Sequence, residues 1–96
     1  MRKIEEQMLN AIRSRKNWAG GNTQVVVHNP TGTSDIHLHG NHIASVPSDL
    51  SGIIVNTDTL RRWPTVTTKS RLRALGANIT QQKGVIYLDG KAVAEV

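Results

Sequence analysis

The sequence predicts an α+β protein: an antiparallel sheet of about six to seven short strands with two helices. Helical periodicity is confined to residues 1–16 and about 67–75, whereas the remaining chain alternates short apolar runs with Gly, Pro, Asn and Asp turns. In addition, residues 36–46 resemble residues 86–96, which indicates a possible tandem α-β-β-β repeat. The length of 96 residues favours a single domain.

The first predicted element is an amphipathic helix over residues 1–16. Its apolar stripe, at a period of 3.6 residues, consists of Ile4, Met8, Ala11 and Ile12. Acidic residues lie in its early turns and basic residues in its last turn, the order that the helix dipole favours. The Ala-Gly-Gly-Asn run at 19–22 is expected to end the helix.

Three strands are expected next. Residues 24–28 contain three consecutive valines, and the Asn-Pro-Thr-Gly run at 29–32 is a turn signal. Residues 35–39 alternate apolar and polar side chains, as a half-buried strand does. A tight turn at 40–41 then leads into a returning strand over residues 42–46.

Residues 47–66 are predicted to be a linker that contains one short strand at 52–56. Trp63-Pro64 should interrupt any helix there, because the residue before a proline disfavours the helical region. Thr67 or Thr68 is expected to cap the second helix.

The second helix should run to about residue 75, with Gly76 as its stop. Residues 78–82 form a weak candidate strand and residues 85–88 a strong one. An Asp-Gly hairpin turn then introduces the last strand, at 91–96.

The similarity between IHLHGNHIASV (36–46) and IYLDGKAVAEV (86–96) suggests two related units, 1–46 and 67–96, within the single domain. Ile, Leu, Gly, Ala and Val recur at five equivalent positions of the eleven. An unrelated pair of hairpins with an I-x-L-x-G pattern would look similar, so both interpretations stay open. Either way, the similarity concerns architecture and not activity.

The net charge of +5 is concentrated in residues 60–74, which contain five basic residues and no acidic one. The helix start in this segment offers hydroxyls and cations, where Asp or Glu is usual. Free N–H groups, hydroxyls and cations together are what proteins use to bind phosphate. The candidate anion- or nucleic-acid-binding residues are Arg61, Arg62, Trp63, Thr67, Thr68, Lys69, Ser70, Arg71 and Arg73. The simpler interpretation is a capped helix with a solvated cationic face.

Three of the four histidines, His37, His39 and His42, follow an H-x-H-x-x-H spacing. His37 and His39 would share one strand face, and three imidazoles are a ligand set of catalytic zinc sites. The second hairpin, however, has Tyr, Asp and Ala at these positions, which favours a half-exposed structural hairpin. The three histidines are therefore minor candidates for a metal site.

Other features exclude several classes. The chain has no cysteine, which removes disulfides, thiolate metal ligands and thiol nucleophiles. It shows no Ser-His-acid signature, no poised carboxylate pair and no nucleotide-binding glycine loop. We therefore expect a protein that is not an enzyme and needs no cofactor. No apolar run suits a membrane span and the N-terminus does not read as a signal peptide, so a cytoplasmic location is expected.

Three motifs, LHGNHIA (38–44), TTKSRLRAL (67–75) and QQKGVIYL (81–88), resemble in that order a group of small proteins of tailed bacteriophages. In that group a YLHGN-x-IA hairpin precedes a TTKSRLNAL helix start and a QKKG-x-W/Y strand. His37 and Arg73 depart from the usual Tyr and Asn, and Gln82 from the usual Lys. The resemblance implies a phage origin, a host-cytoplasm setting and an accessory role, but no activity or site.

Two functional hypotheses follow. In the first, the protein binds nucleic acid or another phosphate-bearing ligand through the basic helix start. In the second, it docks on an acidic surface of a host transcription, replication or defence protein. The oligomeric state stays open in both.

Overall fold

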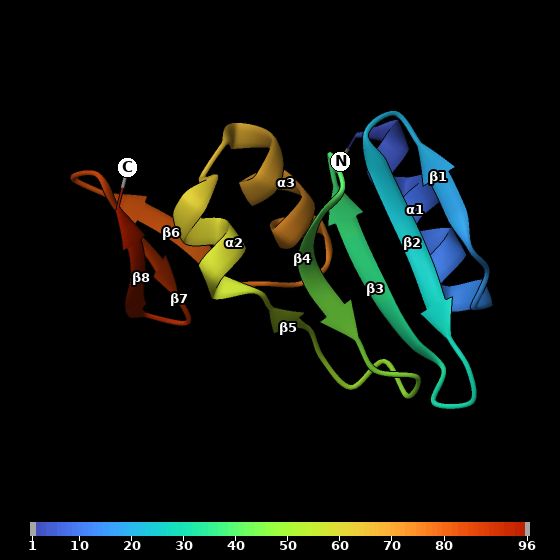
Figure 1. The fold of residues 1–96 in the computed structure, drawn as a ribbon. Coiled ribbons are helices and arrows are strands. Elements are labelled where there is room, and N and C mark those ends of the chain that lie inside the picture. Colours follow the sequence, from blue (N-terminus) through green and yellow to red (C-terminus); the bar gives the residue numbers. More distant parts are fainter. Residues whose placement is uncertain (1, 96) are drawn as a thin grey trace.

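A computed structural model describes residues 2–95 of the chain (Figure 1). Within this range lie three helices, and eight strands in two antiparallel sheets of five and three strands, so the predicted α+β class is confirmed. The elements in chain order are α1 (Lys3–Ser14), β1 (Trp18–Gly20), β2 (Thr23–His28), β3 (Thr33–Leu38), β4 (Asn41–Val46), β5 (Ile54–Val55), α2 (Thr57–Arg62), α3 (Val66–Ala74), β6 (Ile79–Gln82), β7 (Val85–Leu88) and β8 (Lys91–Glu95).

Helix α1 forms as its apolar stripe predicts. Met8 and Ile12 are 0% and 4% exposed, and the helix packs against β1 and β2. The helix ends because Arg15 adopts the left-handed conformation, with φ of 53°. The chain then turns back, and Trp18–Gly20 pairs with β2 as an edge strand that the sequence did not predict.

The larger sheet has the order β1-β2-β3-β4-β5, and each neighbouring pair is antiparallel. Side chains alternate between its two faces, as strand geometry requires. Val25, Ile36 and Leu38 point to the buried face. Figure 1 shows α1 behind β1 and β2, so the face that carries the alternate residues, among them Asp35 and His37, is turned away from α1.

The smaller sheet, of order β6-β7-β8, is joined to the larger one by α2 and α3. Helix α2 packs on β4 and β8, and α3 packs on α1, β4 and β6. Figure 1 shows both helices between the two sheets. Leu60 of α2 and Leu72 of α3 are fully buried, and one hydrophobic cluster extends from Met8 to Ile86.

The two hairpins that resemble each other in sequence also share their turn. Both loops have two residues, His39-Gly40 and Asp89-Gly90. Both residues of each loop have positive φ, between 52° and 83°, as the common two-residue hairpin turns require. The tight turn predicted at 40–41 is therefore wrong by one residue, because His39 tolerates the left-handed conformation and leaves β3.

The hairpins share their register as well. The pairing of β3 with β4 shifts between Ile36 and His37, and that of β7 with β8 shifts at the equivalent place, between Ile86 and Tyr87. A shift of this kind is a β-bulge, which bends the strand and re-aims side chains. The sequence similarity thus corresponds to the same local backbone.

Three further details differ from expectation. Helix α2 occupies part of the predicted linker. The sequence did not indicate this helix, because it buries only Leu60 and shows no apolar stripe. The predicted strand at 52–56 is shorter and spans Ile54–Val55. The cap of α3 is Thr65, so the prediction of Thr67 or Thr68 was wrong. Among the described residues, no helix is both long and apolar enough to cross a membrane.

Candidate functional site

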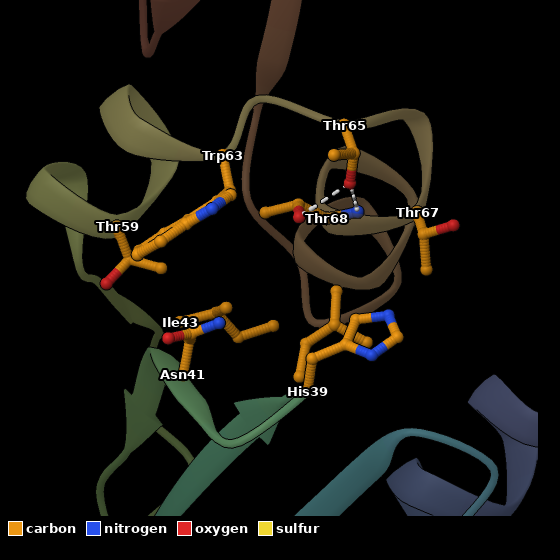
Figure 2. A pocket seen from close by; sticks show the side chains of 9 residues that line it. His39, Asn41, Ile43, Thr59, Trp63, Thr65, Thr67 and Thr68 are labelled. Carbon is orange, nitrogen blue, oxygen red and sulfur yellow. Dashed lines mark hydrogen bonds between the residues drawn. The ribbon is translucent and has the colours of Figure 1, made fainter.

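A pocket of about 340 Å³ lies where the β3–β4 turn meets the end of α2 and the start of α3. It joins the histidine hairpin to the hydroxyl-rich helix start, the two features that stand out in the sequence. Figure 2 shows the indole of Trp63 on one side and the α3 threonines on the other. The lining residues are Leu38, His39, Asn41, Ile43, Thr59, Trp63, Thr65, Thr67 and Thr68.

The helix start on one wall is fixed by two threonines. Thr65 is extended, with φ of −74° and ψ of 161°, and its Oγ1 accepts the N–H of Thr68 at 3.1 Å. The two hydroxyls lie 2.9 Å apart (Figure 2). The Lys69 N–H closes the first intrahelical bond, to Thr65 C=O at 3.0 Å. The N–H groups of Val66 and Thr67 precede that bond, at the positive end of the helix dipole.

Trp63 forms the opposite wall because it follows α2 and precedes Pro64. Proline disfavours a helical conformation at Trp63, so the helix ends at Arg62. The backbone N–H of Trp63 donates to Thr59 C=O at 2.9 Å, which ties the backbone at Trp63 to α2. The residue remains 45% exposed, which is unusual for a tryptophan in a chain with only three aromatic residues.

The size and lining of the pocket suit a single flat ring system. Its volume lies at the lower end of the range for small-molecule sites, roughly 300–1,000 Å³. An aromatic wall allows stacking, and Thr67, Asn41 and His39 are lining residues with hydrogen-bonding side chains. His39 is carried there by the turn, with φ of 53°.

The nine residues proposed from the sequence do not form one surface. Trp63, Thr67 and Thr68 line the pocket. Arg71, however, is buried: its Nη1 donates to Glu5 Oε2 at 2.7 Å and its Nε to Thr23 Oγ1 at 3.0 Å. The acid that residues 60–74 lack in sequence is thus supplied by α1.

Ser70 faces the same carboxylate, to which its Oγ donates at 2.7 Å. Burial opposes ionisation of Glu5, but the hydrogen bonds from Ser70 and Arg71 outweigh it and hold the pKa of this carboxyl below its usual 4.5. Ser70 and Arg71 therefore bind α1 to α3 and lie apart from the pocket.

The other cations lie around the helices. Arg61 pairs with Asp58 at 2.8 Å and also approaches Val93 C=O at 3.4 Å. Lys69 donates to Gln81 Oε1, and Arg73 donates to Ile79 C=O at 3.0 Å. Arg62 is exposed on the last turn of α2, one residue from the pocket wall.

The histidines are arranged differently from the prediction. His39 has left the strand, so His37 and His39 do not share a face. His37 instead stands opposite His42, with ring centroids 5.5 Å apart. His28 joins that face from β2, where its Nε2 contacts Asp35 Oδ2 at 2.6 Å.

A continuous polar network links these histidines to α2. Ser45 Oγ donates to Asp35 Oδ1 at 2.6 Å and contacts His42 Nε2 at 2.9 Å. His42 Nδ1 lies 3.2 Å from Asn56 Nδ2. The Oδ1 of Asn56 accepts the Thr59 N–H, which fixes its amide nitrogen towards His42. The His42 Nδ1 is therefore an acceptor and its Nε2 carries the proton.

The position of the proton on Nε2 of His42 argues against a role of this residue in catalysis or in metal binding. His42 donates to Ser45, so it does not act as a base that removes the Ser45 proton. Both ring nitrogens of His42 are engaged, and no group of three or more metal-ligating residues in the range 2–95 has a geometry suited to a metal ion. The arrangement is a polar network on a sheet surface.

Asp35 is the anionic centre of the network. Burial opposes its ionisation, but hydrogen bonds from Ser45 and His28 outweigh it and hold the pKa of the carboxyl below its usual 3.8. Asp35, Ser45 and Asn56 were not singled out from the sequence. For Asp35 and Ser45 the one available signal was their spacing across the hairpin, because the two residues pair in register, but the bulge between Ile36 and His37 makes this pairing unpredictable without the backbone.

Comparison with known proteins gives one finding. A family model described as "Kyanoviridae Gp96 protein" matches residues 1–96, the whole of the printed sequence. No curated protein and no solved structure matches the chain.

Proposed function

The chain belongs to the Kyanoviridae Gp96 protein family, and we propose that it serves the phage as a small, non-enzymatic accessory protein that binds single-stranded nucleic acid. Family membership establishes the phage origin that the three motifs implied. The observation that carries the proposal is the exposed indole of Trp63, which faces a threonine-rich helix start across a pocket of about 340 Å³.

The pocket would take an unstacked base. Single-strand binding proteins stack bases on aromatic side chains, with about 1–3 kcal/mol per base. A base on Trp63 would place its edge near Asn41 and its sugar-phosphate near Thr67. The N–H groups of Val66 and Thr67, at the positive end of α3, are suited to an anion.

Basic residues support the proposal, but fewer of them are available for binding than the sequence suggested. Arg62 precedes Trp63 and Lys69 follows Thr68 in the sequence, and both cations would add attraction for a phosphate backbone. Arg71 and Ser70 are left out, because Glu5 engages both. The proposed contact set is therefore Trp63, Thr67, Arg62 and Lys69.

A second function, docking on an acidic host protein, is favoured by one observation. Val66 is 70% exposed and lies, in sequence, between Trp63 and the cations of α3. Exposed aromatic and Arg side chains also anchor protein interfaces. The two proposals predict different effects of nuclease, because a protein partner stays bound after nucleic acid has been digested.

The direct test is fluorescence anisotropy with a labelled oligothymidylate, at about 50 mM and about 200 mM salt. The wild-type protein should bind, with an affinity that falls steeply with salt. Trp63→Ala should weaken binding about tenfold or more, the equivalent of one stacked base. Trp63→Phe should lose less, because it keeps a ring.

Trp18→Phe is the matched control, since Trp18 lies on β1, away from the pocket, and its replacement should leave binding unchanged. Absence of binding at low salt to single-stranded DNA and RNA would overturn the proposal, as would equal affinities of Trp63→Ala and Trp18→Phe. Recovery of a nuclease-resistant protein partner through Trp63 would favour docking instead.

A further inference from the structure

A chain of hydrogen bonds connects the open face of the larger sheet to the pocket. His42 Nδ1 accepts from Asn56 Nδ2 at 3.2 Å, and Asn56 Oδ1 accepts the Thr59 N–H at 3.2 Å. The Thr59 C=O then accepts the backbone N–H of Trp63 at 2.9 Å. Three bonds thus lead from a histidine to the backbone of the residue whose indole forms the aromatic wall.

This series of hydrogen bonds requires a neutral imidazole at His42. A neutral ring has one donor and one acceptor nitrogen, and here the acceptor faces the Asn56 amide. A protonated ring has two donors. Its Nδ1–H would then point at the N–H groups of Asn56, and the amide would have to turn its Oδ1 towards His42. That turn withdraws the cap from Thr59.

Loss of this cap matters because α2 has only six residues. Its first turn therefore makes up more than half of the helix. Thr59 belongs to that turn, lines the pocket and accepts the backbone N–H of Trp63. A change at Asn56 consequently reaches the pocket wall directly.

The surroundings of His42 define which other groups act on it. From β3, the carboxylate of Asp35 lies 3.7 Å from His42 Nε2 and offers a counter-charge to a protonated ring. His37 faces it from the same strand, and a charge on His37 would oppose a charge on His42. His28 on β2 reaches the network through Asp35. On the other side, the segment 54–56 carries no titratable group.

We propose that His42 makes the pocket sensitive to pH: neutral His42 holds Asn56 in its capping orientation, and protonation of His42 loosens α2 and Trp63 and so weakens binding of a base. This inference rests on the proposed function, whose regulation it describes. The hairpin itself does not need the histidine, because Ala92 occupies the equivalent position beside an identical bulge. His42 can therefore be replaced without loss of the hairpin.

The binding test compares oligothymidylate affinity at about pH 7.5 and about pH 5.5, on either side of the usual histidine range. Thymine does not titrate there. Wild-type affinity should fall about fivefold on acidification, the equilibrium equivalent of one lost N-cap. His42→Ala should lose this decrease. His37→Ala, which removes a neighbouring histidine without contact to Asn56, should keep it.

A second variant should reverse the effect of acidification on oligothymidylate affinity. Asn56→Asp still caps α2, but its carboxylate is only an acceptor and attracts a protonated His42. Acidification should then leave binding unchanged or strengthen it. A wild-type pH response equal to that of His42→Ala would overturn the inference.

A measurement without ligand separates this inference from the proposed function. In NMR spectra the Thr59 amide resonance should shift with pH at the same midpoint as the His42 ring, and should not shift in His42→Ala. If no oligonucleotide binds at any pH, the proposed function fails while this titration still decides on the switch. A Thr59 resonance that ignores the His42 midpoint would reject the switch, whatever binds.

Discussion

At the scale of single residues, the buried pair of Glu5 and Arg71 holds α1 against α3. The two side chains are 4% and 7% exposed, and their atoms lie 2.7 Å apart. Ser70 and Thr23 complete the hydrogen bonding, and every buried side-chain polar atom in residues 2–95 has a partner. Removal of one partner of such a pair leaves a buried charge, which costs more than the pair itself contributes.

We therefore expect Glu5→Gln to lower the free energy of unfolding by about 3 kcal/mol. The double variant Glu5→Leu with Arg71→Met should be closer to the wild type than the single variants Glu5→Leu and Arg71→Met, because no charge remains buried. Urea unfolding of the wild type, these two single variants and the double variant gives the coupling. Simple additivity of the two single changes would contradict this role of the pair.

The pair also makes stability depend on pH. Because the folded pKa of Glu5 is lowered, the unfolded chain binds a proton first as pH falls. The stability that Glu5 contributes is present above its usual pKa of 4.5 and is lost as pH falls through the lowered, folded value. Glu5→Gln should therefore show a flatter decline of stability below about pH 4.5.

At the scale of elements, short helices depend on their caps. The cap of α3 is Thr65 and not Thr67, although both threonines line the pocket. Thr65→Ala should lower the free energy of unfolding by about 1 kcal/mol. Thr67→Ala, the matched control, should cost only a few tenths of that but weaken oligothymidylate binding. Thermal unfolding of both variants checks the assignment, and equal destabilisation would refute it.

At the scale of the whole molecule, α2 and α3 join two sheets into one core. Because a single hydrophobic cluster spans both sheets, we expect one cooperative unfolding transition. Trp18→Phe leaves Trp63 as a reporter on α2, and Trp63→Phe leaves Trp18 as a reporter on β1. The two fluorescence transitions in urea should coincide with each other and with loss of circular dichroism. Separate midpoints would show that the sheets unfold independently.

The sequence by itself determined the α+β class, the positions of most strands and the likeness of the two hairpins. These features depend on local patterns: the alternation in 33–38, the valines of β2 and the Gly40 and Gly90 turns. It also directed attention to Trp63 and the threonines, because a helix start with hydroxyls and without acids is visible in the sequence alone.

Only the tertiary structure decided which of those residues share a site. Glu5 and Arg71 are 66 positions apart, so nothing in the local sequence indicates that this arginine is neutralised. The orientation of Asn56 depends on a helix, α2, that has no apolar stripe to predict it. Contacts between distant segments arise from packing of the whole core, and they remove Arg71 and Ser70 from the predicted binding surface while they link His42 to Trp63.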